Sequence, residues 1–202
     1  MFTGLIREFA TVVSYENSYL TLKADYKPQI GDSIATNGVC LTVVVVGNGT
    51  FTVELSAETR GIMAVENLKS KVHIEPAMAI GDRLEGHIVQ GHVDCIGVIK
   101  SIKKNQNATD FVLSVPKEYA KFIIPKGSIA VDGVSLTLND VSGSEFRLTI
   151  IKHTLEKTIF SEYKVGRRVN IETDMFARYI YHMFKEKKDI SWDSVDKVMA
   201  LY

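Results

Sequence analysis

The feature that most constrains the fold is an internal repeat. Residues 33–42 align with residues 128–137 at an offset of 95 positions, and seven of the ten residue pairs are identical. The similarity extends on both sides of this block, at an offset of 87 upstream and 97 downstream. Self-similarity at a nearly fixed period is typical of duplicated structural units. We therefore expect two related domains, at residues 1–88 and 89–174, and a distinct segment at residues 175–202.

Each repeated unit has the pattern of an all-β domain. Its apolar stretches are short, rich in Val, Ile, Thr and Phe, and separated by Gly, Asn and Asp. In residues 41–55, two such stretches flank the turn Gly47-Asn48-Gly49 and predict a hairpin. About six strands per unit favour a small closed barrel, which leaves no sheet edge exposed. The expected fold is therefore two tandem barrels.

The segment at residues 175–202 has no counterpart in the first unit. Phe176, Ile180, Met183 and Phe184 recur at helical spacing and predict an amphipathic helix. A second short helix is expected after residues 191–193, where a serine and an aspartate can cap it. An apolar stripe of this kind must be buried, and we expect another subunit to cover it.

Composition and motifs exclude several classes of protein. Lys plus Arg and Asp plus Glu both number 24, and this neutral balance argues against nucleic acid or an anionic membrane as a partner. No apolar run is long enough to cross a bilayer, so we expect a cytoplasmic protein. Cys40 and Cys95 fit no metal or disulfide pattern, and His87 and His92 would lie on opposite faces of a strand. With no glycine-rich nucleotide motif, we expect neither a metal nor a cofactor.

Positions at which the two units differ suggest two roles within one reaction. The differing pairs are Cys40 and Ser135, Glu58 and His153, Leu5 and His92, Phe2 and Val89, and Ala77 and Asp174. Groups that can move protons therefore gather in the second unit. Hydroxyl and thiol side chains near turns also serve purely local structural roles, so both interpretations stay open here.

At its repeated blocks the sequence resembles the riboflavin synthase alpha chain family. The resemblance is carried by Phe2-Thr3-Gly4, residues 33–42, residues 86–94, residues 132–137 and residues 169–174. These motifs occur in the family's order and cover nearly the whole chain. The resemblance implies two six-stranded Greek-key barrels, followed by a C-terminal α-helix that holds a homotrimer together.

The resemblance also implies a reaction. One molecule of 6,7-dimethyl-8-ribityllumazine gives a four-carbon unit to a second molecule, which yields riboflavin and 5-amino-6-ribitylamino-2,4(1H,3H)-pyrimidinedione. The acidic 7-methyl group of the substrate supplies the carbanion, so no cofactor is needed. By the same resemblance, each active site holds two lumazines between the first barrel of one subunit and the second barrel of its neighbour. Some relatives also associate with lumazine synthase.

Six candidate catalytic residues follow from matching the family motifs. They are Phe2, Ser33 and Cys40 from the first barrel and His92, Thr137 and Asp174 from the second. We expect His92 to act as a base or proton shuttle at the 7-methyl group. We expect Ser33 or Cys40, or a water that they position, to add at carbon 7 of the acceptor lumazine.

The repeated segments are the expected substrate-binding segments. One lumazine is expected against Gly4, Leu5, Ile6, Cys40, Leu41, Thr42, Glu54, Leu55, Ser56, Ala57, Glu58 and Thr59. The other is expected against Gly91, His92, Val93, Lys126, Ser135, Leu136, Thr137, Thr149, Ile150, Ile151, Lys152, His153 and Thr154. Backbone amides and hydroxyls suit a neutral ring with a polyol tail.

Two residues depart from the family pattern, and one alternative function stays open. Pro76 stands where the pattern has Arg, and Glu85 stands where a second glycine is common. The alternative is a non-catalytic lumazine-binding or flavin-binding protein of the same fold. The chain retains Cys40 and His92, which argues for the enzyme. A nucleic-acid-binding barrel is disfavoured, because such grooves are basic and aromatic.

Overall fold

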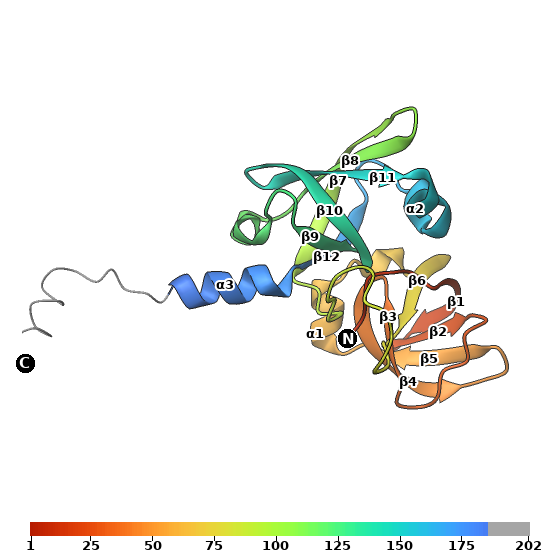
Figure 1. Ribbon diagram of the computed structural model, residues 1–202. Coiled ribbons are helices and arrows are strands. Elements are labelled where there is room, and N and C mark those ends of the chain that lie inside the picture. The colour runs from red at the N-terminus through yellow and green to blue at the C-terminus, as the bar shows by residue number, and fades with distance from the viewer. Residues whose placement is uncertain (186–202) are drawn as a thin grey trace, which may run out of the picture.

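The computed structural model describes residues 1–185, which form two closed antiparallel barrels and a helix that projects away from them (Figure 1). The first barrel contains β1 (Glu8–Glu16), β2 (Tyr19–Lys23), β3 (Ser33–Thr36), β4 (Val39–Val46), β5 (Thr50–Glu54) and β6 (Lys71–Pro76). The second contains β7 (Cys95–Lys104), β8 (Ala108–Ser114), β9 (Ser128–Val131), β10 (Val134–Ser142), β11 (Glu145–Ile151) and β12 (Arg168–Thr173). The predicted pair of six-stranded barrels is confirmed.

The two barrels share one Greek-key strand order. The first runs β1-β2-β5-β4-β3-β6 and closes by pairing β6 with β1. The second runs β7-β8-β11-β10-β9-β12 and closes by pairing β12 with β7. Residues 77–94 connect the barrels, and the expected boundary after residue 88 falls within this connection.

Each barrel encloses its own apolar core because alternate strand residues point inward. On β2, Leu20 and Leu22 pair with Val53 and Phe51 of β5, and all four side chains are at most 1% exposed. A separate small cluster lies where the two barrels meet. It consists of Phe2, Ala35, Val89 and Ala130, with Cys40 packed against it.

Short helices follow several strands. They are α1 (Ala57–Ile62), η1 (Val65–Asn67), η2 (Lys117–Phe122), α2 (Lys152–Lys157) and η3 (Ile159–Glu162). Ser56 caps α1, because its side chain accepts a hydrogen bond of 3.0 Å from the Thr59 amide. The apolar pattern does not predict these helices, since six residues make fewer than two turns.

The helix α3 (Met175–Lys185) confirms the predicted amphipathic helix. It contacts the second barrel through the Tyr181 ring, which meets the Phe122 ring edge to face at 5.4 Å. Phe176, Ile180, Met183 and Phe184 are each more than half exposed. The helix expected after residues 191–193 lies outside the described residues. Within residues 1–185 no helix is long and apolar enough to span a bilayer.

Two tight turns meet where the barrels touch. Gly38 has a φ of +79° and Gly133 a φ of +82°, and the residue before each also has a positive φ, as in type I′ turns. A Cβ atom at Gly38 would lie 2.5 Å from the Gly133 nitrogen. Glycine is therefore required at this contact, both for the turn and for the close approach of the barrels.

Candidate active site

Each barrel is covered by the segment that precedes the other barrel. The segment before β1 crosses to the second barrel, where the Ser135 amide donates a hydrogen bond of 2.8 Å to the Gly4 carbonyl. The segment before β7 crosses to the first barrel, where the Cys40 amide donates a hydrogen bond of 2.9 Å to the Gly91 carbonyl. A Cβ atom at Gly4 or Gly91 would lie within 2.7 Å of the facing Cβ atom. Both crossings therefore need a glycine.

Two buried glutamates hold these crossing segments. Glu75, on β6, accepts hydrogen bonds from the Thr3 amide (2.7 Å), the Thr3 hydroxyl (2.8 Å) and the Gly4 amide (3.0 Å). Glu172, on β12, accepts from the amides of residues 90, 91 and 92 at 2.6, 2.8 and 2.9 Å. Burial raises the pKa of both carboxyl groups, and the donated hydrogen bonds oppose that shift. Glu172 thus fixes the backbone of the loop that carries His92.

The crossing corrects the expected grouping of the substrate-binding segments. A groove of about 380 Å³ is lined by Gly4, Leu5 and Ile6 together with Ser135, His153 and Thr154 of the second barrel. The internal repeat relates this groove to the other crossing, where Gly91 meets Cys40 of the first barrel. The expectation grouped each crossing segment with its own barrel, whereas the structure places each segment against the other barrel. The reason is that an alignment of the two units cannot show which barrel a connecting segment covers.

The hydroxyl and thiol candidates of the first barrel share one face of a hairpin. Ser33 pairs with Thr42, and Ala35 pairs with Cys40, in the register of β3 and β4. The intervening Ile34 is buried in the core, so the paired side chains on either side of it point outward. The second barrel repeats this arrangement with Ser128, Ser135 and Thr137.

Phe2 lies in a different environment from the other candidates. Its side chain is fully buried, and its amide donates a hydrogen bond of 2.8 Å to the Val89 carbonyl. A Cβ atom at Gly91 would lie 3.0 Å from the Phe2 ring. The Phe2 ring is therefore packed where the two barrels meet and supports the crossing segments.

Three further predicted substrate-binding residues have core side chains. Leu41, Leu55 and Ile150 are at most 4% exposed and belong to the cores of their own barrels. Only their backbone atoms are placed to meet a ligand. Lys126 lies in the turn before β9 with a φ of +66°, and its amide donates a hydrogen bond of 2.8 Å to the Leu138 carbonyl.

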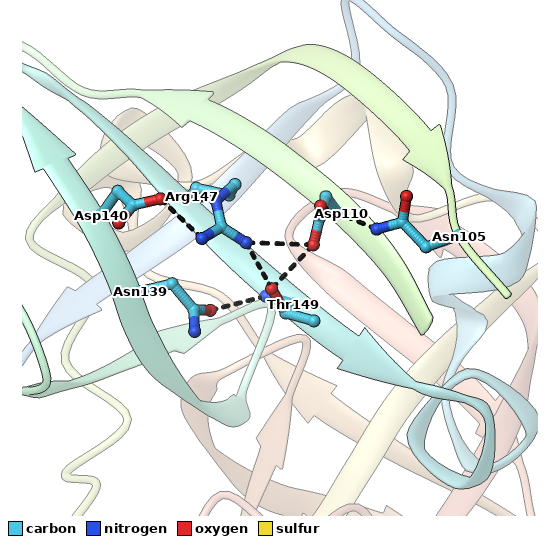
Figure 2. Close-up of polar contacts among 6 residues, drawn as sticks. All are labelled: Asn105, Asp110, Asn139, Asp140, Arg147 and Thr149. Atoms are coloured by element: carbon cyan, nitrogen blue, oxygen red, sulfur yellow. Dashed lines mark hydrogen bonds and ion pairs between the residues drawn. The ribbon is translucent and has the colours of Figure 1, made fainter. Parts of the chain in front are cut away.

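Thr149 belongs to a polar network on the second barrel (Figure 2). Its hydroxyl donates to Asp110 (2.7 Å) and accepts from Arg147 (2.7 Å), and its amide donates to Asn139 (2.9 Å). The Thr149 hydroxyl bond contributes most to lowering the pKa of Asp110. Arg147 also pairs with Asp140 at 2.6 Å. Because the polar groups of Thr149 are engaged, the later residues of this segment, at the start of α2, are better placed to meet a ligand.

His87, which the sequence-based candidates omit, lies beside Ser135. Its Nδ1 atom lies 2.7 Å from the Ser135 hydroxyl, and its amide donates a hydrogen bond of 3.1 Å to the Thr3 carbonyl. Burial lowers the pKa of His87, whereas the negative charge of Asp174 opposes that shift. Asp174 also caps α3 by accepting a hydrogen bond of 2.8 Å from the Phe176 amide. The structure thus groups His87, Ser135 and Asp174 beside the second barrel.

The repeat itself explains why His87 is missed. At the upstream offset of 87, the counterpart of His87 would precede Met1, so no pair of differing residues draws attention to it. The one sequence feature that points to His87 is its spacing from His92, which was examined only as a metal-binding pattern. Among residues 1–185 no group of three or more His, Cys, Asp or Glu side chains is arranged to hold a metal ion.

The two departures from the family pattern line one larger cavity. Pro76 and Glu85 border a space of about 500 Å³, together with Arg7, Glu75 and Arg83. None of the candidate site residues lines it. Its walls carry charged groups of both signs, including Glu75, Arg83 and Glu85.

Comparison with known proteins agrees with this architecture. The family model of the lumazine binding domain matches residues 3–77 and again residues 90–174. Riboflavin synthase of Photobacterium phosphoreum is 43% identical over 193 residues, covering 89% of this chain and 87% of that protein. Riboflavin synthase of Bacillus subtilis (strain 168) is 39% identical over 198 residues, covering 94% and 92%.

Solved structures share the fold at lower sequence identity. LumP complexed with riboflavin has a TM-score of 0.76 and 18% identity, covering 86% of this chain and 99% of that chain. LumP complexed with 6,7-dimethyl-8-(1'-D-ribityl) lumazine has a TM-score of 0.74 and 17% identity over the same shares. The two barrels and the two matched domains thus define a class of double-barrel proteins built from two lumazine binding domains. Within that class, the chain belongs to the riboflavin synthase family, which is a family of transferases.

Proposed function

We propose that the chain catalyses the dismutation of two 6,7-dimethyl-8-ribityllumazine molecules to riboflavin and 5-amino-6-ribitylamino-2,4(1H,3H)-pyrimidinedione. The observation that carries this proposal is that the two crossing segments make equivalent backbone contacts and bring together unequal side chains. Cys40 and His92 lie at one crossing, whereas Ser135 and Leu5 occupy the equivalent positions at the other. Equivalent backbones suit two copies of one substrate, and unequal side chains suit a donor and an acceptor.

The geometry supports catalysis by proximity and by proton transfer. Holding two ring systems in a reactive arrangement lowers a barrier by about 7–11 kcal/mol. In this proposal His92 removes a proton from the 7-methyl group, with its backbone held by Glu172. Ser33 or Cys40, which share the outer face of one hairpin, or a water that they position, adds at carbon 7 of the acceptor. Thr137 and Asp174 act from the second barrel.

The proposed active site lies between copies of the chain. The first barrel of one copy faces the second barrel of its neighbour, and each contributes one lumazine-binding groove. Exposed apolar side chains on α3 support association, because water contact at Phe176, Ile180 and Met183 is unfavourable. We propose that the assembly is a homotrimer in the cytoplasm. We also propose that this assembly associates with lumazine synthase, as some relatives do.

The proposal is tested by incubating the cofactor-free protein with 6,7-dimethyl-8-ribityllumazine. Absorbance and fluorescence follow the loss of lumazine and the formation of riboflavin. We expect one riboflavin for every two lumazines consumed. Tight binding without riboflavin would instead indicate a non-catalytic lumazine-binding protein. Absence of binding would contradict both functions.

A further inference from the structure

We propose that Arg178, on α3, is a positioning residue that holds the loop carrying His92. The inference rests on the proposed role of His92 and adds a second role for α3 besides association. The Arg178 guanidinium donates one hydrogen bond to Asp94 (2.6 Å) and another to Gln90 (2.8 Å). These two residues lie two positions after and two positions before His92, so one side chain spans the loop.

The contact has the features of a stable brace. Guanidinium groups are planar and present several donors in a fixed arrangement, which suits simultaneous bonds to two acceptors. The side chains of Arg178 and Asp94 are 26% and 12% exposed, so water screens this pair less than an exposed surface pair. The other oxygen of Asp94 accepts bonds of 2.7 Å from both the amide and the hydroxyl of Thr173. Asp94 therefore joins α3, β12 and the loop.

The first turn of α3 is itself fixed relative to the second barrel. The Asp174 carbonyl accepts a hydrogen bond of 3.2 Å from the Arg178 amide, and the Asp174 carboxylate caps the same turn. Glu172 and Asp174 flank Thr173 at the end of β12. The loop at residues 90–94 is thus held on one side by strand residues and on the other by Arg178.

The equivalent loop of the first unit has no such brace. At the upstream offset, Gln90 corresponds to Thr3 and Asp94 corresponds to Arg7. Residues 77–94, which follow β6 as α3 follows β12, contain no helix. Glu75 alone repeats the clamp made by Glu172. The additional tie therefore occurs at the loop that carries His92 and is missing from the loop that carries Leu5. A brace needed only for the shared barrel fold would be expected in both units.

The expected consequence is a loss of proton transfer with little loss of binding. A general base must lie within hydrogen-bonding distance of the proton that it removes. Glu172 still holds the backbone of residues 90–92 when Arg178 is replaced, so the groove beside Cys40 keeps its wall. The freedom gained by the loop then affects the placement of the His92 ring more than the binding of lumazine.

The test compares Arg178→Met with wild type and with Lys185→Met, which removes a positive charge about two turns farther along the same helix. Four quantities are measured: exchange of the lumazine 7-methyl protons with deuterium, kcat, lumazine Kd, and hydrogen exchange of the amides at residues 90–94. For Arg178→Met we expect methyl exchange and kcat to fall by about tenfold to a hundredfold, with Kd nearly unchanged. Amide exchange in the loop should rise. Arg178→Lys, which keeps the charge without the planar group, should give intermediate values.

The outcomes separate the two proposals. Unchanged amide exchange and unchanged methyl exchange in assembled Arg178→Met would refute the positioning role. A loss of turnover that disappears at protein concentrations restoring assembly would refute it as well, because Arg178 would then act only through association. Wild-type protein that exchanges no methyl protons and forms no riboflavin would refute the proposed function, whatever the loop does.

Discussion

His73 and Asn170 occupy equivalent positions on the last strands of the two barrels, and each makes a backbone hydrogen bond to the tight turn of its own barrel and side-chain hydrogen bonds to the other barrel. The His73 amide donates to the Asn37 side chain (2.9 Å), and the Asn170 amide donates to the Asp132 side chain (2.7 Å). The His73 Nδ1 atom contacts the Asp132 carbonyl (2.9 Å), and the Asn170 side-chain amide donates to the Asn37 carbonyl (2.9 Å). Each residue thus braces the tight turn of the other half.

His73 and Asn170 each accept one further hydrogen bond from the other half of the chain, and in His73 this bond defines the tautomer of the ring. The His73 Nε2 atom accepts a hydrogen bond from the Ile159 amide (2.8 Å), as the Asn170 side-chain oxygen does from the Ala64 amide (2.7 Å). An Nε2 atom that accepts has no proton, so the proton is on Nδ1 and is donated to the Asp132 carbonyl. The neutral imidazole therefore reproduces the donor and acceptor of an asparagine side chain.

Protonation of His73 should destabilise the fold below neutral pH. Burial lowers the pKa of His73 from 6.5 to about 4, so the folded protein binds this proton less readily than the unfolded chain. The stabilisation is complete above about pH 6.5 and is lost as pH falls towards 4, with a total of about 3 kcal/mol. His73→Asn should lack this dependence.

The pH dependence of wild-type stability must be compared with that of His73→Asn, because other buried groups also titrate in this range. Burial also raises the pKa of Asp132 to about 6, and this contribution is lost as pH rises through that value, which is the opposite trend. Urea unfolding of wild type and His73→Asn at pH 4 and pH 7, at one protein concentration, isolates His73. The difference between their free energies of unfolding should shift by about 3 kcal/mol in favour of the variant at pH 4. An equal pH dependence in both proteins would contradict the assignment.

The contact between the two tight turns should tolerate no side chain. Gly133→Ala places a Cβ atom 2.8 Å from the Gly38 nitrogen, and overpacking of this kind adds about 1–3 kcal/mol. Gly143 also has a positive φ, but no atom lies within 4 Å of its Cβ position, so Gly143→Ala carries only the backbone cost of about 1 kcal/mol. Thermal unfolding should therefore rank Gly133→Ala clearly below Gly143→Ala. Equal melting temperatures of Gly133→Ala and Gly143→Ala would mean that the turns at Gly38 and Gly133 are not in close contact in solution.

Removal of His92 should slow proton transfer strongly while leaving lumazine binding intact. General acid–base groups contribute about 10²- to 10⁴-fold, so kcat of His92→Ala and its methyl-proton exchange should fall by a factor in that range. Stopped-flow absorbance and proton NMR in deuterium oxide measure the two rates. Wild-type rates in His92→Ala would require a different base.

The contact between His87 and Ser135 predicts an effect confined to one groove. His87→Ala leaves the Ser135 hydroxyl without its partner, and a lost hydrogen bond costs about 1 kcal/mol, or roughly fivefold in affinity. Titration calorimetry with lumazine should show weaker binding at one of two sites per chain. Ser135→Ala should weaken the same site, and the double variant should weaken it no further. Equal weakening at both sites would show that His87 acts on the fold as a whole.

The repeat predicted the barrels because local chemistry determines them. Short β-branched strands and the Asn37-Gly38 and Asp132-Gly133 turns specify tight hairpins wherever they occur. The crossing of the segments before β1 and β7 depends instead on contacts between the two units. Both segments carry a glycine at the equivalent position, Gly4 and Gly91, and this glycine does not show which barrel the segment covers. The positions of His87 and Arg178 depend on the same long-range contacts, so no local pattern predicts their partners.

In the proposed assembly, one active site combines the first barrel of one copy with the second barrel of another. A complementation experiment mixes two variants, Ser33→Ala with Cys40→Ala in one chain and Ser135→Ala with Thr137→Ala in the other. Each variant alone should form little riboflavin. After subunit exchange of equal amounts, verified by native mass spectrometry, about a quarter of the shared sites pair two intact barrels. Riboflavin formation should recover to about that fraction of the wild-type rate, and mixed assemblies that stay as inactive as the separate variants would contradict a site shared between copies.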